Sequence, residues 1–320
     1  MLNEKDIILE VKSGSYAYGT NTPESDEDYR GIMIHEVSSY LGCVSNKEQY
    51  EFKSPHDRTI YDIQKYMRLA ADINPSILET LFTRDEDIVS CTKTGELLRE
   101  NRDMFLSKAC KQSYSGYARH QIHKVKTHRG WLLNPPKKKP ERSDYGLPDH
   151  KRLIPKDWIE ALASSDYSPG EANEDAILFS TSEELIAAAK KEKAYKDAMK
   201  HWDSYIHWKE ERNPKRAALE ARYGYDTKHM HHCTRLLLQG NEILEGKGLI
   251  VYRQDREYLK SIRAGKYTYE EMIEETERLS KRMEELYDAC DYLPEISNIN
   301  EINELCIKLI LMKLIGDDNV

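Results

Sequence analysis

The chain has 320 residues, a length that leaves room for a large core or two domains. Its formal net charge is −8, with 32% charged side chains, so it lacks the overall positive charge typical of nucleic-acid binders, although a local basic patch stays possible. The six cysteines form no C-x-x-C pair, so neither a zinc knuckle nor a disulfide framework is expected. No apolar run approaches the length of a membrane span and the N-terminus lacks the apolar segment of a signal peptide, so we expect a soluble, cytoplasmic protein.

The most informative stretch lies near the start of the chain, between two predicted strands. Ile7–Val11 is apolar and is followed by a turn at Gly14 and Ser15. The next strand is predicted over Asp26–Ile34. Because side chains alternate along a strand, Asp26 and Asp28 share one face of it.

This pair of carboxylates indicates a metal site. Two neighbouring carboxylates repel each other unless a cation lies between them, and hard oxygen ligands suit Mg²⁺. The backbone N–H groups of the turn at Gly14 and Ser15 offer a place for a triphosphate. The pattern therefore favours phosphoryl or nucleotidyl transfer, and the alternative is an ordinary solvated turn.

Short strands and helices continue to about residue 105. A loop over 37–55 precedes a short strand at Arg58–Tyr61. Asp62 is placed to cap a helix that runs to about Asp72, because apolar residues repeat there at helical spacing. Asn74 and Pro75 end that helix, and Ser76 is expected to cap the next one.

The remainder of the chain has mainly helical patterns. The predicted helices are Ser107–Leu133, Ser182–Arg212, Asp226–Leu244, Tyr269–Cys290 and Asn300–Leu314. Residues 134–157 are basic and rich in proline, so a long exposed loop is expected. We therefore predict an α+β protein, with a small mixed-sheet domain over 1–105 and a mainly helical domain over 106–320.

The motif G-S-x-A-Y-G-x-x-T-x-x-S-D-x-D-x-R-G resembles the signature of the RlaP family, a branch of the DNA polymerase beta nucleotidyltransferase superfamily found in bacteria and tailed phages. The segments Asp57–Leu69, Asn74–Phe82 and Tyr225–Leu236 are similar to further blocks of that family. The resemblance implies transfer of a nucleoside monophosphate from an NTP such as ATP to a hydroxyl, with Mg²⁺ or Mn²⁺. It also implies RNA repair, with a tRNA-like end as the acceptor.

A site of this family normally has a third carboxylate on a neighbouring strand, which completes the ligands for two metal ions. Asp57 is preferred because it opens the short strand before Tyr61. Asp62 is the alternative, although it could serve only as a helix cap. The predicted catalytic and metal-binding set is Asp26, Asp28 and Asp57.

Several other residues are predicted to bind the nucleotide. Arg30 shares the strand face of the two carboxylates, and Lys228, His232 and Arg235 lie on one helix face at spacings of four and three. For each of these the alternative is a structural or solvated position. The full predicted set is Gly14, Ser15, Tyr18, Ser25, Arg30, Lys65, Lys228, His232 and Arg235.

The richest basic stretch lies between these blocks. Basic residues at 120–129 are followed by Lys137–Lys139 and Arg142, with Trp131 and Tyr145 among them. Basic and aromatic residues together are typical of single-strand binders, whereas the alternative is a solvated loop. Two other functions stay open: nucleotidylation of a protein or small molecule, and a nucleotide-binding module without catalysis.

Overall fold

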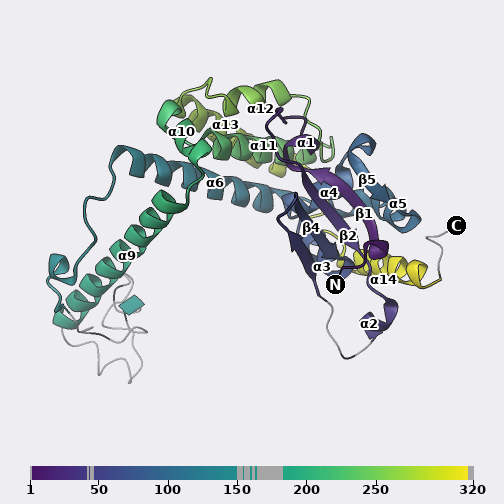
Figure 1. Ribbon diagram of the computed structural model, residues 1–320, viewed down its shortest axis with the longest axis horizontal. Helices are drawn as coiled ribbons and strands as arrows, with labels where there is room; N and C mark the ends of the chain where they lie inside the picture. The colour runs from purple at the N-terminus through teal and green to yellow at the C-terminus, as the bar shows by residue number, and fades with distance from the viewer. Residues whose placement is uncertain are drawn as a thin grey trace. The chain divides into compact units, whose positions relative to one another are not determined.

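The computed structural model describes residues 2–41, 43, 47–149, 154, 159–160, 163 and 183–315 (Figure 1). The chain divides into two compact units. The first contains residues 1–126 and 222–320, and the second contains residues 127–221. In the structure residues 106–126 belong to the first unit together with the sheet. The predicted domain boundary near residue 105 stays a prediction.

The first unit is built around a five-stranded mixed sheet with the order β3-β4-β2-β1-β5. Strand β1 is antiparallel to β2 and to β5, β3 is antiparallel to β4, and β2 and β4 are parallel. The strands are β1 (Ile7–Ser13), β2 (Asp28–Met33), β3 (Gln49–Phe52), β4 (Asp57–Asp62) and β5 (Ile88–Cys91). The predicted mixed sheet and both predicted N-terminal strands are confirmed.

Helices from both ends of the chain pack in this unit (Figure 1). Helix α3 packs on β2 and β4, α4 and α5 pack on β1, and α11 packs on α12 and α13. Their bounds are α1 (Gly14–Ala17), α2 (Val37–Leu41), α3 (Ile63–Ala71), α4 (Pro75–Phe82), α5 (Lys93–Glu100), α11 (Thr227–Leu244), α12 (Arg256–Arg263), α13 (Tyr269–Ala289) and α14 (Ile299–Ile315). Short 3₁₀ helices lie at Glu4–Asp6, Asp85–Asp87 and Arg102–Phe105.

One hydrophobic core joins the sheet to the C-terminal helices. Val11 and Ile32 of the sheet are fully buried in the same cluster as Leu78 of α4 and Leu236 of α11. Burial of each such side chain contributes about 1.5–3 kcal/mol. The mainly helical half of the chain is therefore part of the fold that supports the sheet.

The starts of α3 and α4 show how local chemistry sets these helices. Asp62 caps α3 as predicted, because its carboxylate accepts a hydrogen bond of 2.9 Å from the Gln64 N–H. Helix α4 is capped by Asn74, whose side-chain oxygen accepts from the Ser76 N–H at 3.1 Å. The predicted Ser76 cap is wrong because Pro75 occupies the first helical position, which suits its fixed φ and missing N–H.

The second unit consists of helices joined by a basic segment. It contains the end of α6 (Cys110–Leu133), a 3₁₀ helix at Arg142–Tyr145, α9 (Glu183–Glu211) and most of α10 (Pro214–Tyr223). Ring centroids of Trp131 and Trp208 lie 5.3 Å apart, so aromatic packing joins α6 to α9. Of the predicted loop, residues 150–153 and 155–157 lie outside the described residues. Among the described helices, none combines the length and apolar content needed to cross a membrane.

Candidate active site

Two of the predicted carboxylates lie side by side at one end of the sheet. Asp28 opens β2 and Asp57 opens β4, and the two residues are direct partners in the parallel pairing of these strands. Burial, followed by the Asp57 carboxylate, raises the pKa of Asp28. Asp26, which is exposed, adds to this increase, so all three carboxylates act on one small region.

The turn after β1 contacts this region. Ser13 pairs with Asp28 across the strands, and Gly14 follows it with a φ of +63°. A Cβ atom at Gly14 would lie 2.6 Å from the Asp28 Oδ2, so only glycine fits here without displacement of the carboxylate. The Ser15 carbonyl accepts from the Thr20 N–H at 2.9 Å, and the Ser25 hydroxyl accepts from the Thr22 N–H at 2.9 Å. These bonds fix the loop that leads to Asp26.

The opposite end of β4 carries the other candidates for the third carboxylate and for phosphate binding. Asp62 is five residues along from Asp57, a distance of about 16 Å in a strand. It is 3% exposed, and it accepts a hydrogen bond of 2.5 Å from the Tyr40 hydroxyl. Lys65 lies near this end, and its Nζ is 3.3 Å from a carboxylate oxygen of Glu48. Lys65 therefore lies at the other end of β4 from Asp57, and its predicted contact with phosphate stays a prediction.

Two of the predicted cationic residues lie near the carboxylates. The charges of Arg30 and Lys228 both oppose the increase in the pKa of Asp28, so both lie within electrostatic range of it. Arg30 also donates a hydrogen bond to the Ser76 carbonyl at the start of α4. Lys228 is exposed and belongs to the first turn of α11. Strand β2 and helix α11 thus bring positive charge to the same carboxylates.

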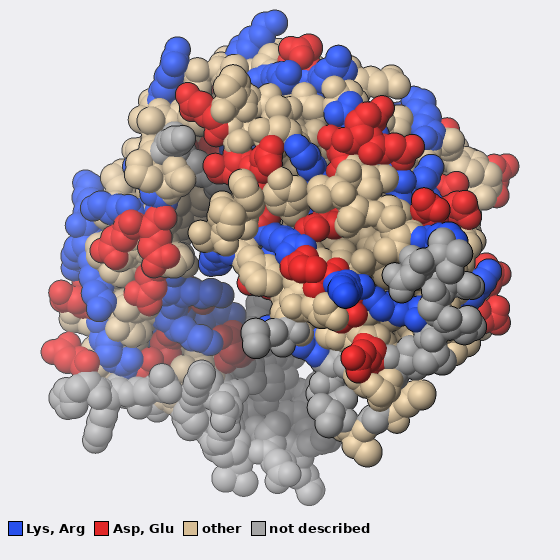
Figure 2. All heavy atoms as spheres, turned by 45° about the vertical axis from the view of Figure 1, so that its right-hand side comes forward, with Lys and Arg blue, Asp and Glu red and all other residues tan. Residues whose placement is uncertain are grey.

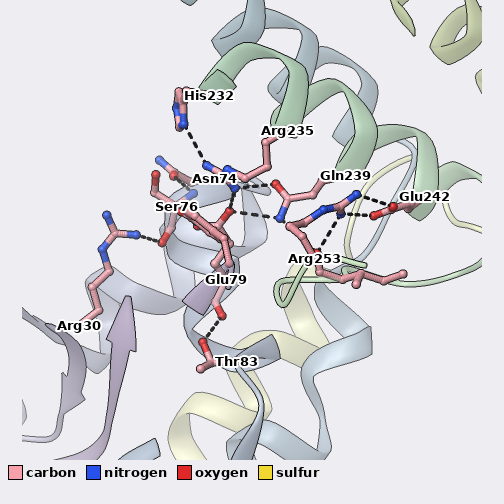
Figure 3. A network of polar contacts seen from close by, with 12 residues as sticks. Arg30, Asn74, Ser76, Glu79, Thr83, His232, Arg235, Gln239, Glu242 and Arg253 are labelled. Carbon is pink, nitrogen blue, oxygen red and sulfur yellow. Dashed lines mark hydrogen bonds and ion pairs between the residues drawn. The ribbon is translucent and has the colours of Figure 1, made fainter. Parts of the chain in front are cut away.

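The structure buries Arg235, which was predicted to contact phosphate. It is 1% exposed, and it donates to Glu79 and to the Gln239 side-chain oxygen at 2.8 Å (Figure 3). Its guanidinium carbon lies 3.8 Å from the centroid of the Tyr18 ring, whose hydroxyl donates to Glu79 at 2.6 Å. Tyr18 and Arg235 thus contact each other and Glu79, and their predicted contact with nucleotide stays a prediction.

Glu79 is the residue that sequence reasoning missed. It accepts hydrogen bonds from Tyr18, Arg235 and Gln239, and so connects α1, α4 and α11. The available signal was its position on a helix turn whose neighbours Ile77 and Leu78 are apolar. A charged residue on the buried side of a helix requires a partner of opposite charge.

Comparison with known proteins identifies the part of the chain that holds the carboxylates. Residues 2–134 match the family model RlaP, described as the RNA repair pathway DNA polymerase beta family. This segment is therefore similar to the RlaP family. It includes the whole five-stranded sheet, whereas α11, with Lys228, His232 and Arg235, lies outside the RlaP match.

A protein of Enterobacteria phage T4, described as an uncharacterized 38.9 kDa protein in the nrdC-mobD intergenic region, is 34% identical over 127 residues. The matched region is 36% of this chain and 38% of the T4 protein. No solved structure matches the chain. The RlaP segment therefore supports a nucleotidyltransferase domain, while the activity of the whole protein is a proposal.

Outside the RlaP segment, His232 is held by the buried network (Figure 3). Its Nδ1 lies 3.0 Å from the Arg235 Nη2. Because a guanidinium only donates, Nδ1 is the acceptor and the proton is on Nε2. Burial, followed by the Arg235 charge, lowers the pKa of His232 to about 2, so the ring is neutral at physiological pH. His232 therefore presents a neutral N–H donor.

Proposed function

We propose that the protein is a metal-dependent nucleotidyltransferase that moves a nucleoside monophosphate from an NTP to a hydroxyl acceptor. The observation that carries this proposal is the pairing of Asp28 with Asp57, with Asp26 close by and the Gly14 turn against them. The match of residues 2–134 to a DNA polymerase beta family supports the same reaction type.

The three carboxylates suit a divalent cation. Carboxylate oxygens are hard ligands, and the carboxylate repulsion that adds to burial in raising the pKa of Asp28 would be relieved by Mg²⁺ or Mn²⁺. Asp26, Asp28 and Asp57 would hold the metal. When bound, it would supply positive charge to the phosphates and to the acceptor hydroxyl.

The reaction places distinct demands on the surrounding residues. The acceptor oxygen bonds to the α-phosphorus, and the bond from the α-phosphorus to the bridging oxygen breaks, so that pyrophosphate leaves. Asp57, the exposed carboxylate at the start of β4, would accept the proton of the acceptor hydroxyl at a carboxylate oxygen. Arg30 and Lys228 would stabilise the charge on the phosphate oxygens, and the Gly14 turn would leave space for the triphosphate.

We propose an RNA end as the acceptor, as in the tRNA-like substrate that the family resemblance implies. The description of the matched family supports RNA repair. Basic and acidic side chains are interspersed over the face in Figure 2, so RNA binding would depend on local basic segments. One such segment is at Lys137–Lys139, where the Lys138 Nζ lies 2.6 Å from Asp144.

A transfer assay tests the proposal. Wild-type protein is incubated with each α-³²P-labelled NTP, Mg²⁺ or Mn²⁺ and total RNA, beside the double variant Asp26→Ala/Asp28→Ala. The matched control is Glu24→Ala, which removes an exposed carboxylate from the same loop. Label on RNA with wild type and control, and none with the double variant, is the expected result.

Two other results would change the proposal. Label on protein or on a small molecule would move the acceptor away from RNA and retain nucleotidyl transfer. Bound nucleotide with no label on any acceptor would leave a nucleotide-binding module and would refute the catalytic role of the carboxylates.

A further inference from the structure

One face of helix α6 contacts α4 and α11. Tyr117, Gln121 and Lys124 lie on that face, because spacings of four and three residues return to the same side of a helix. The Tyr117 hydroxyl accepts a hydrogen bond of 2.8 Å from the Asn74 side-chain nitrogen at the start of α4. The Gln121 side-chain oxygen lies 2.6 Å from His229 Nδ1 in the first turn of α11. Helix α6 is therefore fixed to both helices that border the carboxylates.

Lys124 lies one turn after Gln121 on the same face of α6, and Gln121 contacts His229, which lies one turn before His232 on α11. The charge of Lys124 also contributes to the lowered pKa of His232, so the two side chains are within electrostatic range. Lys124 is half-buried and, among the described residues, forms no ion pair. Lys65 and Lys108 show the usual arrangement in this protein, with carboxylates at 3.3 and 2.7 Å. A half-buried ammonium without a carboxylate indicates a site for an anion.

His232 offers a second group for the same anion. Its Nδ1 is taken by Arg235, and its Nε2–H has no hydrogen-bond partner among the described residues. A neutral N–H donor next to an ammonium suits a phosphate oxygen.

Tyr117 brings an aromatic side chain to the start of α4. The residue is 41% exposed, although its hydroxyl is fixed by Asn74. Asn74 caps α4, and the Ser76 carbonyl two residues later accepts from Arg30 (Figure 3). Tyr117 and Arg30 therefore both bond to the start of α4, and the charge of Arg30 also acts on Asp28.

We propose that α6 completes the nucleotide site, with Lys124 and the Nε2–H of His232 binding the triphosphate and Tyr117 stacking on the base. This inference rests on the proposed function, and it assigns residues of α6 to the NTP. The triphosphate would then lie between positive side chains of β2, α6 and α11 on one side and the carboxylates with their metal on the other. An exposed aromatic ring and a base of any type stack favourably, so the subsite does not by itself select one base.

Equilibrium dialysis separates the two contacts. The probes are the α,β-methylene analogue of the NTP that wild type binds most tightly, inorganic tripolyphosphate, and the matching nucleoside. Lys124→Ala should weaken the analogue and tripolyphosphate about tenfold or more and leave the nucleoside unchanged, since a charge-assisted hydrogen bond is lost. Tyr117→Leu, which keeps an apolar side chain, should weaken the analogue and the nucleoside about tenfold and leave tripolyphosphate unchanged.

Three control variants test whether these losses come from the ammonium and the aromatic ring themselves. Lys124→Arg and Tyr117→Phe should keep most of the affinity. Lys126→Ala removes an exposed lysine from nearly the opposite side of α6 and should change nothing.

The inference would be overturned if Lys124→Ala and Lys126→Ala had equal effects on affinity, or if Tyr117→Leu left the nucleoside affinity unchanged. In either case, nucleotide binding by wild type would still support the proposed function. If wild type binds the α,β-methylene analogue of none of the four NTPs, the proposed function fails first and the subsite fails with it.

Discussion

The buried contact between Glu79 and Arg235 gives the sharpest prediction about stability. Glu79 is 5% exposed and Arg235 1% exposed, and the carboxylate also accepts from the Tyr18 hydroxyl at 2.6 Å. Glu79→Gln keeps the shape but leaves the Arg235 charge buried without a counter-ion. Breaking a buried pair in this way costs about 3–5 kcal/mol, and we expect about 3 kcal/mol because the glutamine oxygen still accepts hydrogen bonds.

A double-mutant cycle tests whether this loss comes from the unpaired charge. Arg235→Met should lower the free energy of unfolding by a similar amount. The double variant Glu79→Gln/Arg235→Met leaves no buried charge, so its loss should be smaller than the sum of the single losses by about 2 kcal/mol. Urea unfolding followed by circular dichroism gives each value.

The control for this cycle is an exposed ion pair. Glu275 lies 2.7 Å from Arg278, which is 66% exposed, and Glu275→Gln should change the free energy of unfolding by less than about 1 kcal/mol. Additive losses in the cycle, or a loss in Glu79→Gln no larger than that of the control, would refute the reasoning.

Three further predictions concern the site and its surroundings. Gly14→Ala should reduce the transfer rate about tenfold in the radiolabel assay, because a residue with a side chain is strained at this positive φ by about 1–2 kcal/mol. The added Cβ would also lie 2.6 Å from the Asp28 Oδ2, and a wild-type rate in this variant would contradict the placement of the turn. Lys65→Ala should leave that rate within about twofold of wild type, because its ion pair lies at the other end of β4, and a large loss would return Lys65 to the site. Burial lowers the pKa of His231 to about 3 and that of His232 to about 2, so the unfolded state binds more protons below a pH of about 6.5, and stability is lost as the pH falls. In urea unfolding we expect the free energy of unfolding to be lower at pH 5 than at pH 8 by about 2 kcal/mol for each histidine. His232→Gln should abolish about half of this total loss. A loss in the variant equal to that of wild type would show that the His232 ring is not held neutral.

The strands, the helices and the pair of acidic residues were predictable because each depends on local sequence. The strand pattern predicts that Asp28 lies on β2, although Asp26 precedes that strand, and the cap at Asp62 follows from a short side chain before a helical repeat. Strand register is different, because it depends on which residues of two distant segments face each other. The parallel pairing of Asp28 with Asp57 therefore required the structure.

Helical spacing predicted a shared face for Lys228, His232 and Arg235 but not what that face contacts. The stripe begins at an exposed position and ends at a buried one within α11, because the start of the helix lies beside the carboxylates and the next turns pack on α4. One face of a helix thus contains both a cation near the site and a cation in the core. Spacing alone could not distinguish these two environments.

The same buried network explains why the family match and the folded unit end at different places. The RlaP match ends at residue 134, yet Glu79 inside it is neutralised by Arg235 outside it. A carboxylate that is 5% exposed on α4 is costly without that partner, so α11 is required for the stability of the segment that holds the carboxylates. Because Tyr18 of the turn also bonds to Glu79, α11 reaches the candidate site through the protein interior as well as through Lys228 at its surface.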